Sequence, residues 1–142
     1  MSKRTLFLML ALVVLAFSVS AAAAQGYPAP DGKAIITRLM TDILSGGKLE
    51  LIPEIYAADF VDHSPLGETN GVDGMTAYIG NLRTAFPDMQ VETQLLISDA
   101  DWVAGRFVVS GTFTGELVTP AGAVPGNGGP ISIPVHHIWQ VN

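Results

Sequence analysis

The spacing of apolar residues changes once along this chain, and that change constrains the fold more than any other feature. Between residues 31 and 86, apolar side chains recur at the three- and four-residue spacing of helices that are buried on one face. From residue 89 onward they alternate every second residue, as in half-buried strands. Helices followed by antiparallel strands predict an α+β domain, with N-terminal helices packed on one face of a curved sheet.

The first helix is predicted to begin after Asp31, whose carboxylate is suited to cap a helix N-terminus. Gly46 and Gly47 are expected to end it. One face of this helix carries all of its large apolar residues, which are Ile35, Ile36, Leu39, Met40, Ile43 and Leu44.

Two further helices are expected before the strands. A short one covers residues 49–56 with Pro53 in its first turn, and a longer one covers residues 72–86. Between them, residues 60–63 are expected to be extended and residues 64–71 to form a polar loop.

Three long strands are predicted over residues 89–97, 102–113 and 131–141, with a turn at residues 99–101. Residues 115–130 contain five glycines and three prolines, so this segment is expected to be a loop.

The N-terminus has the pattern of a secretory signal peptide. Lys3 and Arg4 precede an apolar run over residues 6–17, and three alanines at residues 22–24 form a small-residue cleavage site before Gln25. The apolar run is shorter than the ~20 residues that a membrane-spanning helix needs. We therefore expect residues 1–24 to be removed on export to the periplasm or the exterior, and no membrane attachment afterwards.

The remaining chain is expected to be a short linker over residues 25–32 and one domain over residues 33–142. Cleavage would remove two of the seven basic residues and none of the thirteen acidic ones, leaving a strongly acidic protein without cysteine. An acidic surface with dispersed cations is unsuited to nucleic acid, so the expected partners are small molecules or a second copy of the chain.

Four segments carry a resemblance to a known family. They are Ile-Tyr-Ala-Ala-Asp-Phe-Val-Asp-His at residues 55–63, Gly-Val-Asp-Gly-Met at 71–75, Ala-Phe-Pro-Asp at 85–88, and the stretch at 103–115. Together they resemble the SnoaL-like polyketide cyclases, also described as ester cyclases, of the nuclear transport factor 2-like superfamily. The resemblance implies a cone-shaped curved sheet around one apolar pocket, and cofactor-free chemistry.

The histidines are candidates for acid–base chemistry because imidazole titrates near neutral pH. The resemblance implies that His63 faces the cone, although a loop histidine that only satisfies backbone groups is the alternative. His136 and His137 are adjacent in a strand and point to opposite faces. The more apolar neighbours favour His137 as the pocket residue, and a structural histidine remains the alternative. Adjacent strand histidines cannot chelate one ion, so no metal site is expected.

Arg106 is the only cation of the strand region. It is expected either to pair with a carboxylate such as Asp62 or Glu92, or to orient an anionic or enol oxygen of a substrate. The residues expected to contact a substrate are mostly aromatic and are Tyr56, Phe60, Asp62, Tyr78, Phe86, Trp102 and Trp139.

The chain departs from the family at its C-terminus. Relatives continue into a final strand followed by the aspartate that removes a carbon-bound proton, whereas this chain stops at Asn142. The final strand and the aspartate therefore have no counterpart, and residues 131–141 are expected to be a sheet edge. Two explanations stay open: a truncated chain, or closure by another subunit in a homodimer.

Two functions follow as hypotheses. The first is an exported cyclase that needs no cofactor and performs proton transfer and aldol-type ring closure on a small apolar carbonyl compound, using His63, His137 and Arg106. The second is a non-catalytic module of the same fold that binds a small ligand or dimerises.

Overall fold

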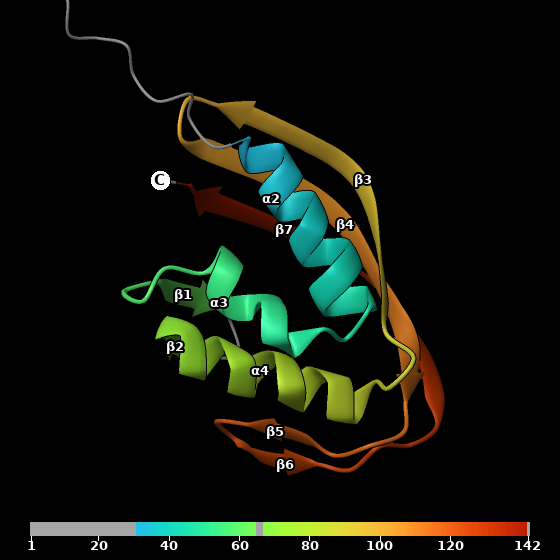
Figure 1. Cartoon of the computed structure of the whole chain (residues 1–142). Helices are drawn as coiled ribbons and strands as arrows, with labels where there is room; N and C mark the ends of the chain where they lie inside the picture. Colours follow the sequence, from blue (N-terminus) through green and yellow to red (C-terminus); the bar gives the residue numbers. More distant parts are fainter. Residues whose placement is uncertain (1–30, 65–66, 142) are drawn as a thin grey trace, which may run out of the picture.

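A computed structural model describes residues 31–64 and 67–141 of the chain. Figure 1 shows helices lying on the concave side of a long, curved antiparallel sheet. The α+β class predicted from the change in apolar spacing is confirmed, and so is the order of helices before long strands. The expected signal peptide and nearly all of the expected linker lie outside the described residues.

The first helix is α-helical over Gly32–Arg38 (α2) and π-helical over Leu39–Ser45 (η1). The Asp31 carboxylate accepts a hydrogen bond from the Ala34 amide at 3.3 Å, which confirms the predicted cap. The wider second half ends at Ser45, whose hydroxyl donates to the Met40 carbonyl at 2.8 Å. The same hydroxyl accepts from the Val91 amide at 3.0 Å, so the helix end is tied to the first long strand.

The second helical segment consists of η2 (Leu49–Leu51) and α3 (Ile52–Ile55), with Pro53 in its first turn as predicted. The third predicted helix is α4 (Gly71–Ala85).

The prediction of a polar loop over residues 64–71 is wrong. The described part of this region forms strand β2 (Gly67–Asn70), which pairs antiparallel with β1 (Val61–Ser64). No strand was predicted here because a short polar hairpin has no run of alternating large apolar residues.

The main sheet has the order β3 (Gln90–Asp99), β4 (Trp102–Phe113) and β7 (Gly129–Gln140), with both pairings antiparallel. The pairing between β3 and β4 shifts register between Thr93 and Leu95, where an extra residue forms a bulge. Within the described residues β7 pairs only with β4, so it is an edge of this sheet.

The segment expected to be an unstructured loop contains a second short hairpin, β5 (Leu117–Thr119) and β6 (Gly122–Val124). Two reciprocal hydrogen bonds fix it to α4: the Asn81 amide donates to the Val118 carbonyl at 2.7 Å, and the Val118 amide donates to the Asn81 side-chain oxygen at 2.9 Å. The glycines and prolines of this segment are typical of turns. They do not exclude strands of three residues between those turns, and for that reason the hairpin was not predicted.

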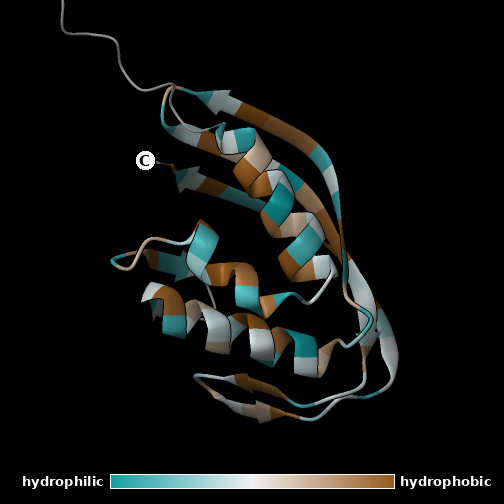
Figure 2. Ribbon diagram, viewed as in Figure 1, coloured by the Kyte–Doolittle hydropathy of each residue, from teal (hydrophilic) through white to brown (hydrophobic). Residues whose placement is uncertain are grey.

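The core lies between the helices and the concave face of the sheet. Figure 2 shows that the helices carry apolar residues among polar ones, as amphipathic packing requires. The largest fully buried side chains are Ile36, Leu39, Ile43, Ile52, Ile79, Val103 and Phe107. A second, smaller core cluster consists of Ala85, Phe86 and Met89, at the end of α4 and just after it. Tyr56 is buried as well, and apart from it no residue with a polar or charged side chain in the described part of the chain is buried.

Arg83 holds the end of the first helix, the end of α4 and the start of β3 together. One guanidinium nitrogen lies 3.2 Å from each of the carbonyl oxygens of Leu44, Ser45 and Met89, and another lies 2.9 Å from the carbonyl of Pro87. The forked donor geometry of arginine allows one side chain to serve several carbonyls.

Among the helices that the structure describes, none is long and apolar enough to cross a membrane.

Candidate functional site

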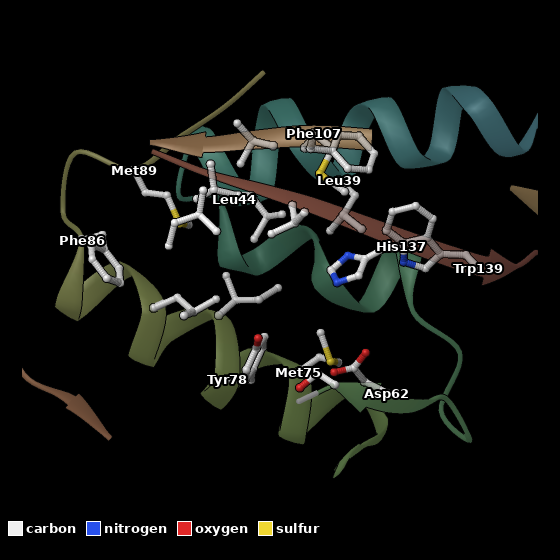
Figure 3. Close-up of a pocket in the computed structure, with 18 of the residues that line it drawn as sticks. Leu39, Leu44, Asp62, Met75, Tyr78, Phe86, Met89, Phe107, His137 and Trp139 are labelled. Carbon is white, nitrogen blue, oxygen red and sulfur yellow. The ribbon is translucent and has the colours of Figure 1, made fainter. Parts of the chain in front are cut away.

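A cavity of about 420 Å³ lies between the helices and the concave face of the sheet. Figure 3 shows side chains from both layers converging on it. This volume is in the range of small-molecule sites. Most of its lining is apolar, and these residues are Leu39, Met40, Leu44, Phe60, Met75, Ile79, Leu82, Phe86, Met89, Val91, Phe107, Val109, Leu117, Ile131, Ile133, Val135 and Trp139.

The polar groups of the cavity gather at one end. Asp62 and Ser64 reach it from β1, because alternation along that strand turns every second side chain inward. Tyr78 comes from α4, Tyr56 from the C-terminal end of α3, and His137 from β7. In Figure 3 the labelled Asp62, Tyr78 and His137 lie around the same space.

The imidazole of His137 is held in its neutral form. Although His137 lies on an exposed edge strand, the partial burial of its ring in the cavity lowers its pKa from the ordinary 6.5, and the negative charge of Asp62 opposes that shift without cancelling it. The ring of Trp139 stands edge-on to the imidazole, with ring centres 5.3 Å apart. His137 therefore presents an unprotonated nitrogen at neutral pH, which can accept a proton.

The cavity is open beside this imidazole. His137 and Ile133 both line the cavity, and a large part of the surface of each residue is also exposed to solvent. Both belong to β7, the edge strand of the main sheet, so we place the mouth of the pocket along that edge.

The two tyrosines keep their protons. Burial raises the pKa of Tyr56, and the nearby Asp62 and Tyr78 raise it further. Burial also raises the pKa of Tyr78, while a hydrogen bond with the Ser64 side chain lowers it and Asp62 raises it. Both phenols are therefore hydrogen-bond donors rather than phenolates at neutral pH. The ring of Tyr56 packs edge-on against Phe60 at 4.7 Å.

The structure brings seven of the residues selected from the sequence to this cavity. They are Tyr56, Phe60, Asp62, Tyr78, Phe86, His137 and Trp139. The preference for His137 over His136 agrees with its placement, because the face of β7 with the more apolar residues is the one that faces the helices.

Three selected residues lie outside the cavity. His63 points away from it on β1 and is exposed, with its Nδ1 atom 3.5 Å from a Glu68 carboxylate oxygen. Arg106 and Trp102 are exposed on the opposite face of the sheet, because the inward positions of β4 are taken by Val103 and Phe107. The expected pair between Arg106 and Asp62 is therefore not formed, since the sheet separates them.

Ser64 also lines the cavity but was not predicted from the sequence. The signal that could have identified it is its position two residues after Asp62, which places both side chains on the same face of β1. Leu117, which reaches the cavity from the hairpin that was expected to be a loop, was not predicted either. Among the described residues, no three His, Cys, Asp or Glu side chains gather into a group that could hold a metal ion.

The SnoaL-like polyketide cyclase family model matches this chain over residues 34–142. Among curated proteins, none matches this chain.

Solved structures of similar fold include a SnoaL-like candidate polyketide cyclase from Jannaschia sp. CCS1, with a TM-score of 0.68, 16% identity, and coverage of 82% of this chain and 81% of that one. IdmH from Streptomyces antibioticus, a candidate polyketide cyclase, has a TM-score of 0.64, 26% identity, and coverage of 79% and 84%. A Catenulispora acidiphila protein with a ketosteroid isomerase-like fold, solved with trimethylamine, has a TM-score of 0.61, 16% identity, and coverage of 80% and 78%.

Proposed function

Because this chain belongs to the SnoaL-like polyketide cyclase family, we propose that its pocket binds an uncharged, largely apolar carbonyl compound and moves a proton within it. The observation that carries the proposal is the placement of the Asp62 carboxylate and the His137 imidazole at one end of an otherwise apolar cavity. Such a cavity suits a ligand with an apolar body and one polar end.

The charge of the lining supports an uncharged ligand. Among the described residues that line the cavity there is no lysine or arginine, and Asp62 is the only acidic one. A carboxylate or phosphate on the ligand would be desolvated next to a carboxylate and without a cation, which is costly. A ketone or an ester avoids that cost.

His137 acts as the base in this proposal. Its neutral imidazole takes a proton from the carbon next to the ligand carbonyl, and the two electrons of the carbon–hydrogen bond pass into an enolate. The negative charge of Asp62 stabilises the imidazolium that forms.

Tyr78 takes the role that the sequence assigned to Arg106. Its phenol remains protonated, and its hydroxyl lies at the polar end of the cavity beside Ser64 and Asp62. A hydrogen bond from this hydroxyl to the enolate oxygen would stabilise the charge that develops there.

Ring closure completes the reaction. The enolate carbon bonds to a second carbonyl carbon of the same molecule, and the oxygen of that carbonyl takes the proton from the imidazolium. His137 returns to its neutral form, so the aldol step consumes no oxidant, reductant or cofactor.

A binding module without turnover is the second candidate. The exposure of His137 at the pocket mouth favours it, because water beside the imidazole weakens the electrostatic stabilisation of an enolate.

The test uses uncharged aromatic diketones and their matched carboxylic acids. We expect the diketones, and not the acids, to raise the melting temperature of the protein, and NMR to detect the cyclised product, which is an isomer of the diketone with the same mass. The His137→Gln variant should bind the diketones without forming product. Binding by the wild type with no product would support the binding module, and preferential binding of the acids would contradict both candidates.

A further inference from the structure

The pocket is long, and its two ends differ in chemistry. Along β7 it extends from His137 to Ile131, since every second residue between them also lines it. Six residues of strand at ~3.3 Å each make this distance ~20 Å. Figure 3 shows Asp62 and His137 at one end of the pocket and Phe86 and Met89 at the other. The proposed proton transfer uses only the first of these ends.

The other end, which we call the distal end, is lined by side chains that both face the cavity and belong to the smaller core cluster. They are Leu44, Leu82, Phe86, Met89, Val109, Leu117 and Ile131. None of these described residues has a polar side chain, so a polar group on the far end of a ligand would lose its hydrogen bonds to water without replacement. The distal end therefore suits an apolar ligand terminus.

Most aromatic rings of the lining lie near the polar end instead. Phe60 packs on Tyr56, and Trp139 packs on His137. The one aromatic ring of the distal end, Phe86, packs against the ring of Phe113 at 5.1 Å. Aromatic rings recognise flat groups by stacking, whereas aliphatic side chains and methionine adapt to flexible chains. This division favours a ligand with its carbonyl group at one end and an aliphatic tail at the other.

The pocket is also narrow for its length. Its volume of about 420 Å³, spread over ~20 Å, corresponds to a mean cross-section of ~20 Å². An extended hydrocarbon chain is about 4–5 Å across, given carbon–carbon contact distances of ~4 Å. One such chain fits this cross-section, and a fused ring system lying across the pocket does not.

We propose that the ligand is a ketone or ester with an unbranched aliphatic tail, and that Leu117 sets the length of tail that the pocket accepts. This inference rests on the proposed function, because it takes the carbonyl group to lie beside Asp62 and His137. An extended chain advances ~1.3 Å per carbon, given carbon–carbon bonds of ~1.5 Å. The tail therefore holds roughly ten carbons, once the carbonyl group and the contact distances at both ends are allowed for.

Leu117 forms a fixed end wall for such a tail. It reaches the distal end from β5, whose next residue, Val118, is hydrogen-bonded to the side chain of Asn81 on α4. Just before Leu117, the amides of Thr114 and Gly115 both donate to the Ala85 carbonyl at 3.1 Å. The strand is thus held to the end of α4 on both sides of Leu117, so this side chain is positioned to stop a tail.

The test measures the affinity of the purified protein for 2-alkanones of increasing length by calorimetry. We expect affinity to rise about fourfold for each added methylene. We expect the rise to stop at tails of roughly ten carbons. Any apolar surface would give the rise, so the position of the limit is the diagnostic result.

Two substitutions at one position should move this limit in opposite directions. Leu117→Ala should shift it to tails longer by about two carbons, which is the length of side chain removed, and Leu117→Trp should shift it to shorter tails. Val118→Trp is the matched control. Val118 is the next residue on the same strand but is 60% exposed and does not line the cavity, so the limit should stay unchanged.

The contradicting outcomes separate this inference from the proposed function. Affinity that does not depend on tail length would overturn the inference alone, and so would a limit that neither Leu117 variant moves. Tighter binding of acenaphthenone, a fused-ring ketone with as many carbons as 2-dodecanone, would do the same. If no uncharged ketone binds at all, the proposed function fails together with the inference.

Discussion

Asp62 and His137 lie at the same end of the pocket although they belong to β1 and β7, two strands that do not pair with each other. The carboxylate is close enough for its charge to act on the pKa of the imidazole. A histidine whose pKa burial depresses is neutral at neutral pH and can accept a proton, while the carboxylate favours the imidazolium once it forms. This pair is the chemical centre of the proposed site.

The first prediction concerns the titration of His137. Its pKa in the folded protein should lie below 6.5, because burial disfavours the charged ring more than Asp62 favours it. Asp62→Asn should lower that pKa further, since it removes the opposing charge. Proton NMR of the imidazole measures both values, and Glu68→Gln, on the neighbouring strand, is the control that should leave His137 unchanged.

The sign of the shift sets the pH dependence of activity. The neutral base is present above its pKa, so activity should fall as the pH drops through that lowered pKa, and Asp62→Asn should move the acid limb to lower pH. An acid limb that moves upward in Asp62→Asn would contradict the assignment of His137 as the base.

The second prediction concerns Arg83. Arg83→Lys should destabilise the fold by about 2–3 kcal/mol, because an ammonium group cannot reach the four carbonyl oxygens that the guanidinium serves and leaves some of them without donors. Arg38→Lys is the control: Arg38 forms exposed ion pairs with Asp42 and Glu54, which contribute at most about 1 kcal/mol. Chemical denaturation measures both, and equal losses would refute the role given to Arg83.

The third prediction concerns the hairpin of β5 and β6. Asn81→Ala removes both hydrogen bonds that fix Val118 to α4, so amide exchange at Val118 should accelerate by roughly thirtyfold, given about 1 kcal/mol for each hydrogen bond. Thr84→Ala is the control, because the Thr84 hydroxyl bonds only to the Gly80 carbonyl within α4. Exchange at Val118 that is already fast in the wild type would show that the hairpin is mobile, as its glycine and proline content alone would predict.

The fourth prediction concerns export. We propose that residues 1–24 are removed as a signal peptide, on the basis of Lys3, Arg4, the apolar run and the alanines at residues 22–24. Mass spectrometry of the exported protein should find an N-terminus within a few residues of Gln25. A full-length chain retained with the membrane fraction would contradict export.

The sequence predicted the elements well where one face of an element is clearly apolar. On β7 the faces differ, since Ile133, Val135 and Trp139 share one of them, so alternation placed His137 toward the helices. On β4 both faces carry apolar residues. The alternation of residues showed that Trp102 and Arg106 lie on the same face of the strand, but it did not show which face points to the interior. That ambiguity put two residues of the convex face on the list of pocket candidates.

Short polar elements were the other source of error. The strand β1 offers only four residues, so no periodicity distinguished the inward Asp62 from the outward His63. The β5–β6 hairpin is fixed by hydrogen bonds between Val118 and Asn81 of α4, which are 37 residues apart, and local spacing does not reveal such contacts.

The most direct test of the central claim is proton exchange at carbon. An uncharged aryl ketone that binds the pocket is incubated with the protein in deuterated water, and NMR follows loss of the proton on the carbon next to the carbonyl. We predict that the wild type and His136→Gln, whose changed side chain lies on the convex face, exchange this proton at equal rates. His137→Gln should be slower by about 10²–10⁴-fold while still binding the ketone. Equal exchange by His137→Gln and the wild type would contradict the claim that His137 is the base.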